Sequence, residues 1–184
     1  MSKEKSLELI RTCLKNFNKI AKKLKAPNTM IIRGVHNYVY LDLKDSKARF
    51  ILDIGCGDAY ILSKLMRHQS KNGLKLFGID KSERELKKAK RRVSKLPIRI
   101  KKGFSDKIPF KRKFDLIYSS SSYHEWNDKD SSIKHILKKL GKNGKFIIYD
   151  MHINDLSRFK RKYHGFTVKI TNLKPLLKIE FIRI

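Results

Sequence analysis

The sequence predicts an α/β protein with a doubly wound, mostly parallel sheet of seven strands and an antiparallel hairpin at its C-terminus. Two observations carry this prediction. From Phe50 to Tyr149, short apolar runs alternate with segments of helical period, which is the pattern of repeated βα units. Beyond them, residues 166–173 and 176–184 are two strand-like runs separated by little more than Lys174-Pro175, which indicates a hairpin.

The alternation assigns the elements in chain order. Strands are expected at residues 50–54, 74–79, 98–102, 114–118 and 145–149, ahead of the two hairpin strands. Helices are expected at residues 59–68, 83–95 and 129–140, and Gly141 is expected to close the last of them. Successive parallel strands need crossover connections, so this order predicts a doubly wound arrangement.

The first 49 residues follow no such rhythm. A helix is predicted up to about Lys25, ended by Ala26-Pro27, because apolar residues recur at steps of three and four. Residues 28–49 have no clear period and are assigned as a loop with room for a short helix or strand. We therefore divide the chain into a basic N-terminal helical extension at 1–49, either part of the same domain or a substrate lid, and one domain at 50–184.

Composition narrows the class of protein. No apolar stretch approaches the ~18 residues that span a bilayer, and the N-terminus is charged throughout, so we expect no membrane segment or signal peptide and a cytoplasmic location. The cysteines are Cys13 and Cys56, too few for a disulfide framework or a multi-cysteine zinc site. We therefore expect free thiols and no metal centre.

The formal net charge of +28 is unevenly distributed. Residues 1–49, 81–102 and 138–184 carry net charges of +8, +9 and +9, whereas residues 50–80 and 103–137 carry +1 each. Heat adaptation raises glutamate together with lysine, but here 45 basic residues stand against 17 acidic ones. The imbalance predicts a polyanionic partner, with nucleic acid the leading candidate and RNA its leading form.

A glycine turn marks the first candidate ligand site. Asp53-Ile54-Gly55-Cys56-Gly57 comes directly after an apolar strand and directly before a helix, the context in which glycines let a backbone approach a ligand closely. Asp80 ends the next strand, where its carboxylate can accept hydrogen bonds from both hydroxyls of a ribose. An NAD site is disfavoured because the run Gly55-Cys56-Gly57-Asp58-Ala59 lacks the spaced third glycine.

These motifs resemble the class I S-adenosylmethionine-dependent methyltransferases, close to the type 11 branch, over residues 50–150. The further matching elements are Gly78-Ile79-Asp80, Ile108-Pro109-Phe110, Phe114-Asp115-Leu116-Ile117-Tyr118 and the segment from Leu137 to Ile148. The resemblance implies the Rossmann-like methyltransferase fold and S-adenosylmethionine as cofactor. It also implies a cofactor site formed by Asp53, Gly55, Cys56, Gly57, Asp80, Lys81, Phe104, Ser105, Ser119 and Ser120.

The sequence departs from the family at two positions. Ala59 stands where the family often has another glycine. Phe104 stands where the family commonly has an aspartate that holds the adenine amine. Either Asp106 takes over that role from two residues along, or Phe104 stacks on adenine while a backbone group pairs with the amine.

The segment after the fourth strand, Ser119 to Trp126, is expected beside the transferable methyl group. This segment lacks the asparagine-proline-proline-tyrosine signature that the resemblance associates with methylation of planar amines. It also lacks a cysteine nucleophile for methylation of pyrimidine carbons. Both of these nucleic-acid chemistries are therefore disfavoured. His124 is the candidate general base, although methyl transfer often needs none, and a capping or packing role is the alternative. Tyr123 and Trp126 are candidates to stack on the substrate or to close the cofactor pocket.

Three functions follow from these features. The first is methylation of RNA, such as tRNA or rRNA, because the chain offers no inserted lid to enclose a small acceptor. The second is methylation of a small molecule, towards which the type 11 branch leans. The third is a non-catalytic nucleic-acid-binding protein on a methyltransferase scaffold, for which the unusual Phe104 is the rationale.

Overall fold

The computed structural model describes residues 28–68, 73–173 and 176–184, and only Lys5, Glu8, Thr12 and Asn16 before them. The apolar stripe of the predicted first helix and Cys13 lie outside the described residues. No helix within the described ranges has the length and apolar character needed to cross a membrane.

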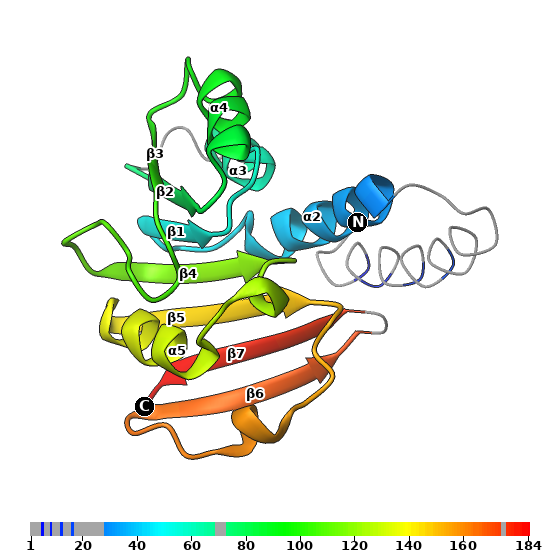
Figure 1. The fold of residues 1–184 in the computed structure, drawn as a ribbon, viewed down its shortest axis with the longest axis vertical. Coiled ribbons are helices and arrows are strands. Elements are labelled where there is room, and N and C mark those ends of the chain that lie inside the picture. The colour runs from blue at the N-terminus through cyan, green and yellow to red at the C-terminus, as the bar shows by residue number, and fades with distance from the viewer. Residues whose placement is uncertain are drawn as a thin grey trace.

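In the described part of the chain, seven strands form one sheet in the order β3-β2-β1-β4-β5-β7-β6 (Figure 1). The first five are parallel to one another, and β7 is inserted antiparallel between β5 and β6. This confirms the predicted fold class, including the C-terminal hairpin. The strands are β1 (Phe50–Ile54), β2 (Lys75–Asp80), β3 (Ile98–Lys102), β4 (Phe114–Ser120), β5 (Leu140–Asp150), β6 (Phe166–Asn172) and β7 (Leu177–Arg183).

Three predicted helices are confirmed with small changes of boundary: α3 (Tyr60–His68), α4 (Glu83–Arg92) and α5 (Lys129–Lys138). Two of them begin at side chains suited to cap a helix. The Ser82 hydroxyl accepts from the amide of Glu85, and the Asp128 carboxylate accepts from the amide of Ser131. Short 3₁₀ turns η1 (Tyr123–Glu125) and η2 (Ser157–Lys160) complete the fold.

The assignment of residues 28–49 as a loop is wrong, because Asn28–Leu43 forms the sixteen-residue helix α2. One face of this helix is buried, and its members Val35, Tyr38, Val39 and Leu43 are spaced by three and four residues. These side chains are β-branched, aromatic or near the end of the helix, so their intrinsic helix propensity is a weak signal. Packing against the rest of the fold overrides it. Helix α2 lies in the same core cluster as α3 and the sheet.

The prediction that Gly141 closes α5 is also wrong. The helix ends at Lys138, and Gly141 lies within β5, which begins five residues earlier than the expected strand. The register between β4 and β5 shifts between Phe114 and Leu116, and a Cβ at Gly144 would meet the carbonyl oxygen of Phe114 at 2.9 Å. The irregular first part of β5 is rich in polar residues and glycines, so the apolar pattern in the sequence did not indicate a strand there.

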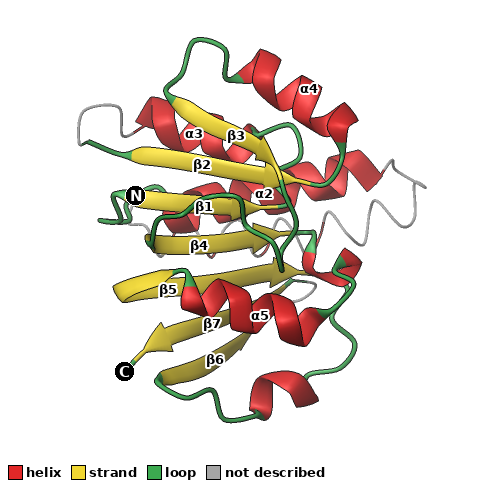
Figure 2. Ribbon diagram, turned by 60° about the vertical axis from the view of Figure 1, so that its left-hand side comes forward, coloured by secondary structure: helices red, strands yellow, loops and turns green. Residues whose placement is uncertain are grey.

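The two faces of the sheet are covered unequally. Helices α2, α3 and α4 pack on one face, and α5 with η2 packs on the other (Figure 2). On that second face, residues 103–113 connect β3 to β4 without a helix. There Ile108 and Phe110 cover the sheet, and the rings of Phe77, Phe110 and Phe114 contact one another edge to face. Part of this face is therefore covered by a thin layer of chain that runs from the carboxyl end of β3 to the amino end of β4.

Candidate functional site

The glycine turn lies between the carboxyl ends of β1 and β2. Gly55 and Gly57 have φ of 74° and 50°, in the left-handed region that glycine enters at little cost. The amides of Gly55 and Cys56 both donate to the carbonyl oxygen of Ile79, which fixes the turn against β2. Ala59 has φ 59°, so the position where the family often has glycine keeps a left-handed backbone with an alanine in it.

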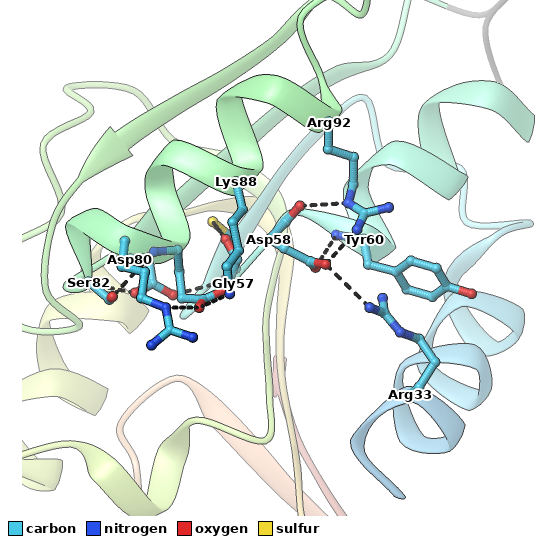
Figure 3. A network of polar contacts seen from close by, with 11 residues as sticks. Arg33, Gly57, Asp58, Tyr60, Asp80, Ser82, Lys88 and Arg92 are labelled. Atoms are coloured by element: carbon cyan, nitrogen blue, oxygen red, sulfur yellow. Dashed lines mark hydrogen bonds and ion pairs between the residues drawn. The ribbon is translucent and has the colours of Figure 1, made fainter. Parts of the chain in front are cut away.

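Asp80 is held with both carboxylate oxygens in place. Oδ2 accepts from the amide of Gly57 and Oδ1 from the amide of Ser82, each at 2.8 Å (Figure 3). These bonds link the end of β2 to the glycine turn of β1. Each oxygen retains further acceptor capacity, so Asp80 offers an oriented carboxylate suited to a pair of hydroxyl donors.

Asp80 opens onto a cavity of about 520 Å³ at this edge of the sheet. Gly55, Lys81, Phe104, Ser105 and Trp126, all predicted from the sequence, also line it. Its charged residues are four acids and two lysines, an acidic wall in a protein of net charge +28. They are Asp80, Asp106, Glu125, Asp128, Lys81 and Lys107. The cavity therefore suits a ligand that carries net positive charge, as a sulfonium with an ammonium and one carboxylate does.

Residues 103–107 form the wall expected to hold adenine. The ring of Phe104 is 47% exposed, and Asp106 lines the same cavity. Ser105 is buried, and its hydroxyl shares a hydrogen bond of 2.8 Å with that of Ser132 on α5. The two side chains considered for adenine from the sequence, Phe104 and Asp106, therefore both line the cavity.

Asp53 is fully buried one strand away from Asp80. Burial raises the pKa of Asp53 to about 8, although a hydrogen bond from the Tyr118 hydroxyl to Oδ2 at 2.8 Å opposes the shift. Its Oδ1 and the hydroxyls of Ser120 and Ser121 are buried without a hydrogen-bond partner among the described residues. Buried polar atoms are nearly always satisfied, so each of these atoms retains capacity for a further hydrogen bond, although none of the three residues lines the cavity.

Cys56 and Ser119 lie behind the cavity wall. The thiol of Cys56 lies where a Cβ at Gly78 would approach to 2.9 Å, and burial raises the pKa of this thiol well above its usual value. Such a thiol is inert as a nucleophile. The hydroxyls of Ser119 and Ser122 share a hydrogen bond of 2.8 Å, and Ser122, which the sequence reasoning did not select, lines the cavity beside Gly55.

The loop after β4 buries its aromatic residues. Tyr123 is 3% exposed and packs between the rings of Trp126 and Phe159. Trp126 is also buried but contributes to the cavity wall. His124 remains half-buried, and its Nδ1 lies 2.9 Å from Oδ2 of Asp150 at the end of β5. Sequence reasoning missed Asp150, since nothing local pairs it with a histidine 26 residues earlier.

A second group of charges joins α2 and α4 across the glycine turn. Asp58 forms ion pairs with Arg33 at 3.3 Å and with Arg92 at 2.6 Å (Figure 3). Partial burial favours a raised pKa for Asp58, but the two guanidinium groups outweigh it and hold the pKa below its usual value. Arg33 also lies over the ring of Tyr60 at 3.9 Å. This network fixes the helix ends next to Gly57.

A family model described as a methyltransferase domain matches residues 45–178. The chain belongs to the class I S-adenosylmethionine-dependent methyltransferases. The chain is 34% identical over 99 residues to the uncharacterized methyltransferase YdaC of Bacillus subtilis, across 53% of this chain and 54% of that protein. It is 30% identical over 150 residues to a ubiquinone biosynthesis O-methyltransferase of Pelagibacter ubique, across 71% of this chain and 60% of that protein.

The chain thus spans little more than half the length of these two curated relatives. Among solved structures, the S-adenosylhomocysteine-bound methyltransferase PaMTH1 of Podospora anserina has the same fold, with a TM-score of 0.66 and 14% identity. That similarity covers 83% of this chain and 79% of the other.

Proposed function

We propose that this methyltransferase binds S-adenosylmethionine in the cavity beside Asp80 and transfers its methyl group to RNA. The observation that carries the choice of RNA is a cationic surface that reaches the mouth of an acidic cofactor cavity. When bound, the cofactor supplies the methyl group on a sulfonium. The chain supplies the binding site, the orientation of the acceptor and the exclusion of water.

For the cofactor, Asp80 is the ribose ligand and residues 103–107 form the adenine wall. The support is the orientation of the Asp80 carboxylate by the amides of Gly57 and Ser82, together with the net negative charge of the cavity wall. Calorimetric titration with S-adenosylmethionine tests this assignment. Asp80→Ala is expected to weaken binding at least tenfold, since charge-assisted hydrogen bonds contribute about 1.5 to 3 kcal/mol each.

A matched control is Glu83→Gln, which removes one negative charge three residues away, outside the cavity wall. Glu83 pairs with Lys102 at 2.7 Å. This variant is expected to bind the cofactor within about twofold of the wild type, because exposed pairs contribute little. Equal affinity of Asp80→Ala and wild type removes the ribose assignment.

The cationic surface lies over β3 and the 103–113 segment. From residue 81 to residue 113 the chain has 15 lysines and arginines and 3 acidic residues. We call Arg99, Lys101, Lys107, Lys111 and Arg112 the β3 surface. In the described part of the chain, none of these five forms an ion pair with an acidic side chain.

Aromatic rings lie beneath several of these cations. Arg99 is 5.8 Å from the ring centre of Phe77, Lys101 is 5.4 Å from that of Phe110, and Arg112 is 3.4 Å from that of Phe50. Lys107 lines the cofactor cavity, so the β3 surface continues to its mouth. Unpaired cations that are held in place and repel one another favour a partner with closely spaced phosphates.

Salt-dependent binding of single-stranded RNA tests the docking surface. Each neutralised phosphate contributes about −0.7 to the slope of log affinity against log salt. The triple variant Arg99→Gln, Lys101→Gln, Lys107→Gln is expected to reduce the slope by roughly two units. As a control, Lys142→Gln removes an exposed charge from the start of β5 and leaves the slope within one unit. A triple variant with the wild-type slope contradicts the proposal.

A second candidate is methylation of a small molecule. It is favoured by the 30% identity to an enzyme named as a ubiquinone biosynthesis O-methyltransferase. Under this alternative, the β3 surface has no part in catalysis. The double variant Arg99→Gln, Lys101→Gln, which leaves the cavity wall intact, then methylates its acceptor at the wild-type rate, and high salt leaves that rate unchanged.

A further inference from the structure

We propose that Asp150 is a positioning residue that orients His124 as a general base, and that the methyl acceptor is a hydroxyl oxygen. The inference rests on the proposed methyl transfer and deepens it by naming the acceptor group. It concerns the carboxyl ends of β4 and β5, next to the cofactor cavity. Three features of the structure carry it. The carboxylate of Asp150 is buried, Nδ1 of His124 is within hydrogen-bond distance of it, and Nε2 of the same ring has no such contact with Asp150.

Asp150 is the last residue of β5 and its side chain has no exposed area. Its oxygens lie 2.9 and 3.1 Å from Nδ1 of His124. The amide of His152 donates to Oδ1 at 2.9 Å, and the amide of His124 donates to Oδ2 at 3.3 Å. Backbone donors therefore fix the carboxylate, and the fixed carboxylate in turn orients the imidazole.

An ionised carboxylate can only accept hydrogen bonds, so Nδ1 of His124 carries the proton when the ring is neutral. The lone pair is then on Nε2. The side chain of His124 is 31% exposed, and Nε2 lies 3.8 Å from Oε1 of Glu125, a residue of the cavity wall. Nε2 thus lies beside a residue that lines the cavity we assign to the cofactor, although His124 itself does not line that cavity.

The remaining charged and titratable groups around His124 come from the neighbouring elements. The ring of His152 is 4.9 Å away, centre to centre, and the ammonium group of Lys129 donates to the carbonyl oxygen of His124 at 3.4 Å. Lys81, directly after β2, forms an ion pair with Glu125 at 3.0 Å, and the other oxygen of that carboxylate lies 3.8 Å from the imidazole. Asp150 is therefore the carboxylate in closest contact with the ring.

A base of this kind is needed only for certain acceptors. An alcohol must lose its proton as its oxygen forms the new bond to carbon, whereas an amine or a ring nitrogen with a free lone pair can attack first. In the proposed step, Nε2 of His124 takes the hydroxyl proton, the oxygen–methyl bond forms and the sulfur–methyl bond breaks, with its electron pair left on sulfur. The imidazolium then releases the proton to solvent.

Two-bond ¹H–¹⁵N correlation spectra of the histidine rings test the first half of the inference in the cofactor-free protein. At pH 8 we expect His124 in the Nδ1–H form, with its signal assigned by its loss in His124→Gln. In Asp150→Asn the amide can donate to Nδ1, and the spectrum is expected to show Nε2–H. Asp155→Asn is the control, because the Asp155 carboxylate accepts hydrogen bonds from the amide and hydroxyl of Ser157 rather than from a histidine. A wild-type His124 in the Nε2–H form overturns the inference, even if the variants are unstable.

Methyl transfer with radiolabelled S-adenosylmethionine tests the second half in whichever acceptor fraction takes label. Asp150→Asn is expected to lower kcat roughly 100-fold and to move the pH profile, with little change in cofactor affinity. His124→Gln and the double variant lose a similar factor, since the two residues act as one unit. Label on nitrogen or carbon, or a wild-type kcat and pH profile in Asp150→Asn, overturns the inference. If no fraction takes label although the cofactor binds, the proposed function is refuted. The spectra of the cofactor-free protein then still determine the tautomer of His124.

Discussion

Asp53→Asn is expected to stabilise the cofactor-free protein increasingly as the pH rises. The carboxyl of Asp53 is fully buried, and its pKa is raised to about 8 in the fold from a usual value of 3.8. Between these two values the folded state keeps a proton that the unfolded state has lost. Stability is therefore lost as the pH increases through this window. An asparagine has the shape of the protonated carboxyl and does not titrate.

The size of the effect follows from proton linkage. One pKa unit corresponds to about 1.36 kcal/mol, so the variant gains about 1.4 kcal/mol over the wild type for each pH unit between roughly 5 and 8. The accumulated difference over that range is about 4 kcal/mol. Urea unfolding of both proteins at four pH values measures it, and the difference between them cancels the titration of every other group.

Tyr118→Phe provides a matched control for the same site. The Tyr118 hydroxyl bonds Oδ2 of Asp53 and favours its ionised form. Without it the pKa of Asp53 rises further, and the loss of stability continues to higher pH than in the wild type. If the difference in unfolding free energy between wild type and Asp53→Asn stays constant from pH 5 to pH 8, the claim that this carboxyl is neutral in the fold is refuted.

Three further substitutions have expected effects on unfolding free energy in denaturant titrations. Ala59→Gly relieves a left-handed alanine and is expected to stabilise the protein by about 1 kcal/mol; a loss of stability contradicts this. Burial lowers the pKa of His36 to about 4. Because the unfolded state protonates first, stability falls as the pH drops from 6.5 to 4, by about 3 kcal/mol. His36→Phe removes that dependence; an unchanged slope excludes His36 as its source. Asp58→Asn removes the ion pairs with Arg33 and Arg92 and is expected to lower the unfolding free energy by about 1 kcal/mol. The control Lys88→Gln, which removes one exposed ion pair, is expected to lower it by less than about 0.5 kcal/mol. Equal losses in the two variants contradict the bridging role of Asp58.

The parts of the fold that sequence reasoning predicted are those with a local periodic signal. Strands β1 to β4 and helices α3 and α4 have apolar runs or stripes of the right period, and the two strand-like runs of the hairpin are separated in the sequence by little more than Lys174-Pro175. Helix α2 was missed because its buried stripe includes β-branched and aromatic residues next to Gly34. Its helical state depends on packing against α3 and the sheet, which local propensity does not encode.

The candidate site divides in the same way. Gly55, Gly57 and Asp80 could be found because a short turn and the end of a strand place them together through sheet topology alone. The pairing of His124 with Asp150 depends on the register of β4 and β5, in which Ser120 lies beside Tyr149. Ser122 was passed over in a run of four serines, since its distinguishing feature is contact with Gly55. Long-range contacts of this kind leave no periodic trace in the chain.

Transfer of a labelled methyl group from S-adenosylmethionine is the direct test of the proposed RNA methylation. The protein is incubated with separate RNA, DNA, protein and metabolite fractions, alongside the Asp80→Ala variant. We expect label in the RNA fraction, loss of that label with Asp80→Ala, and loss of it at high salt. Label confined to the metabolite fraction, or absent from all fractions while the cofactor binds, would contradict it.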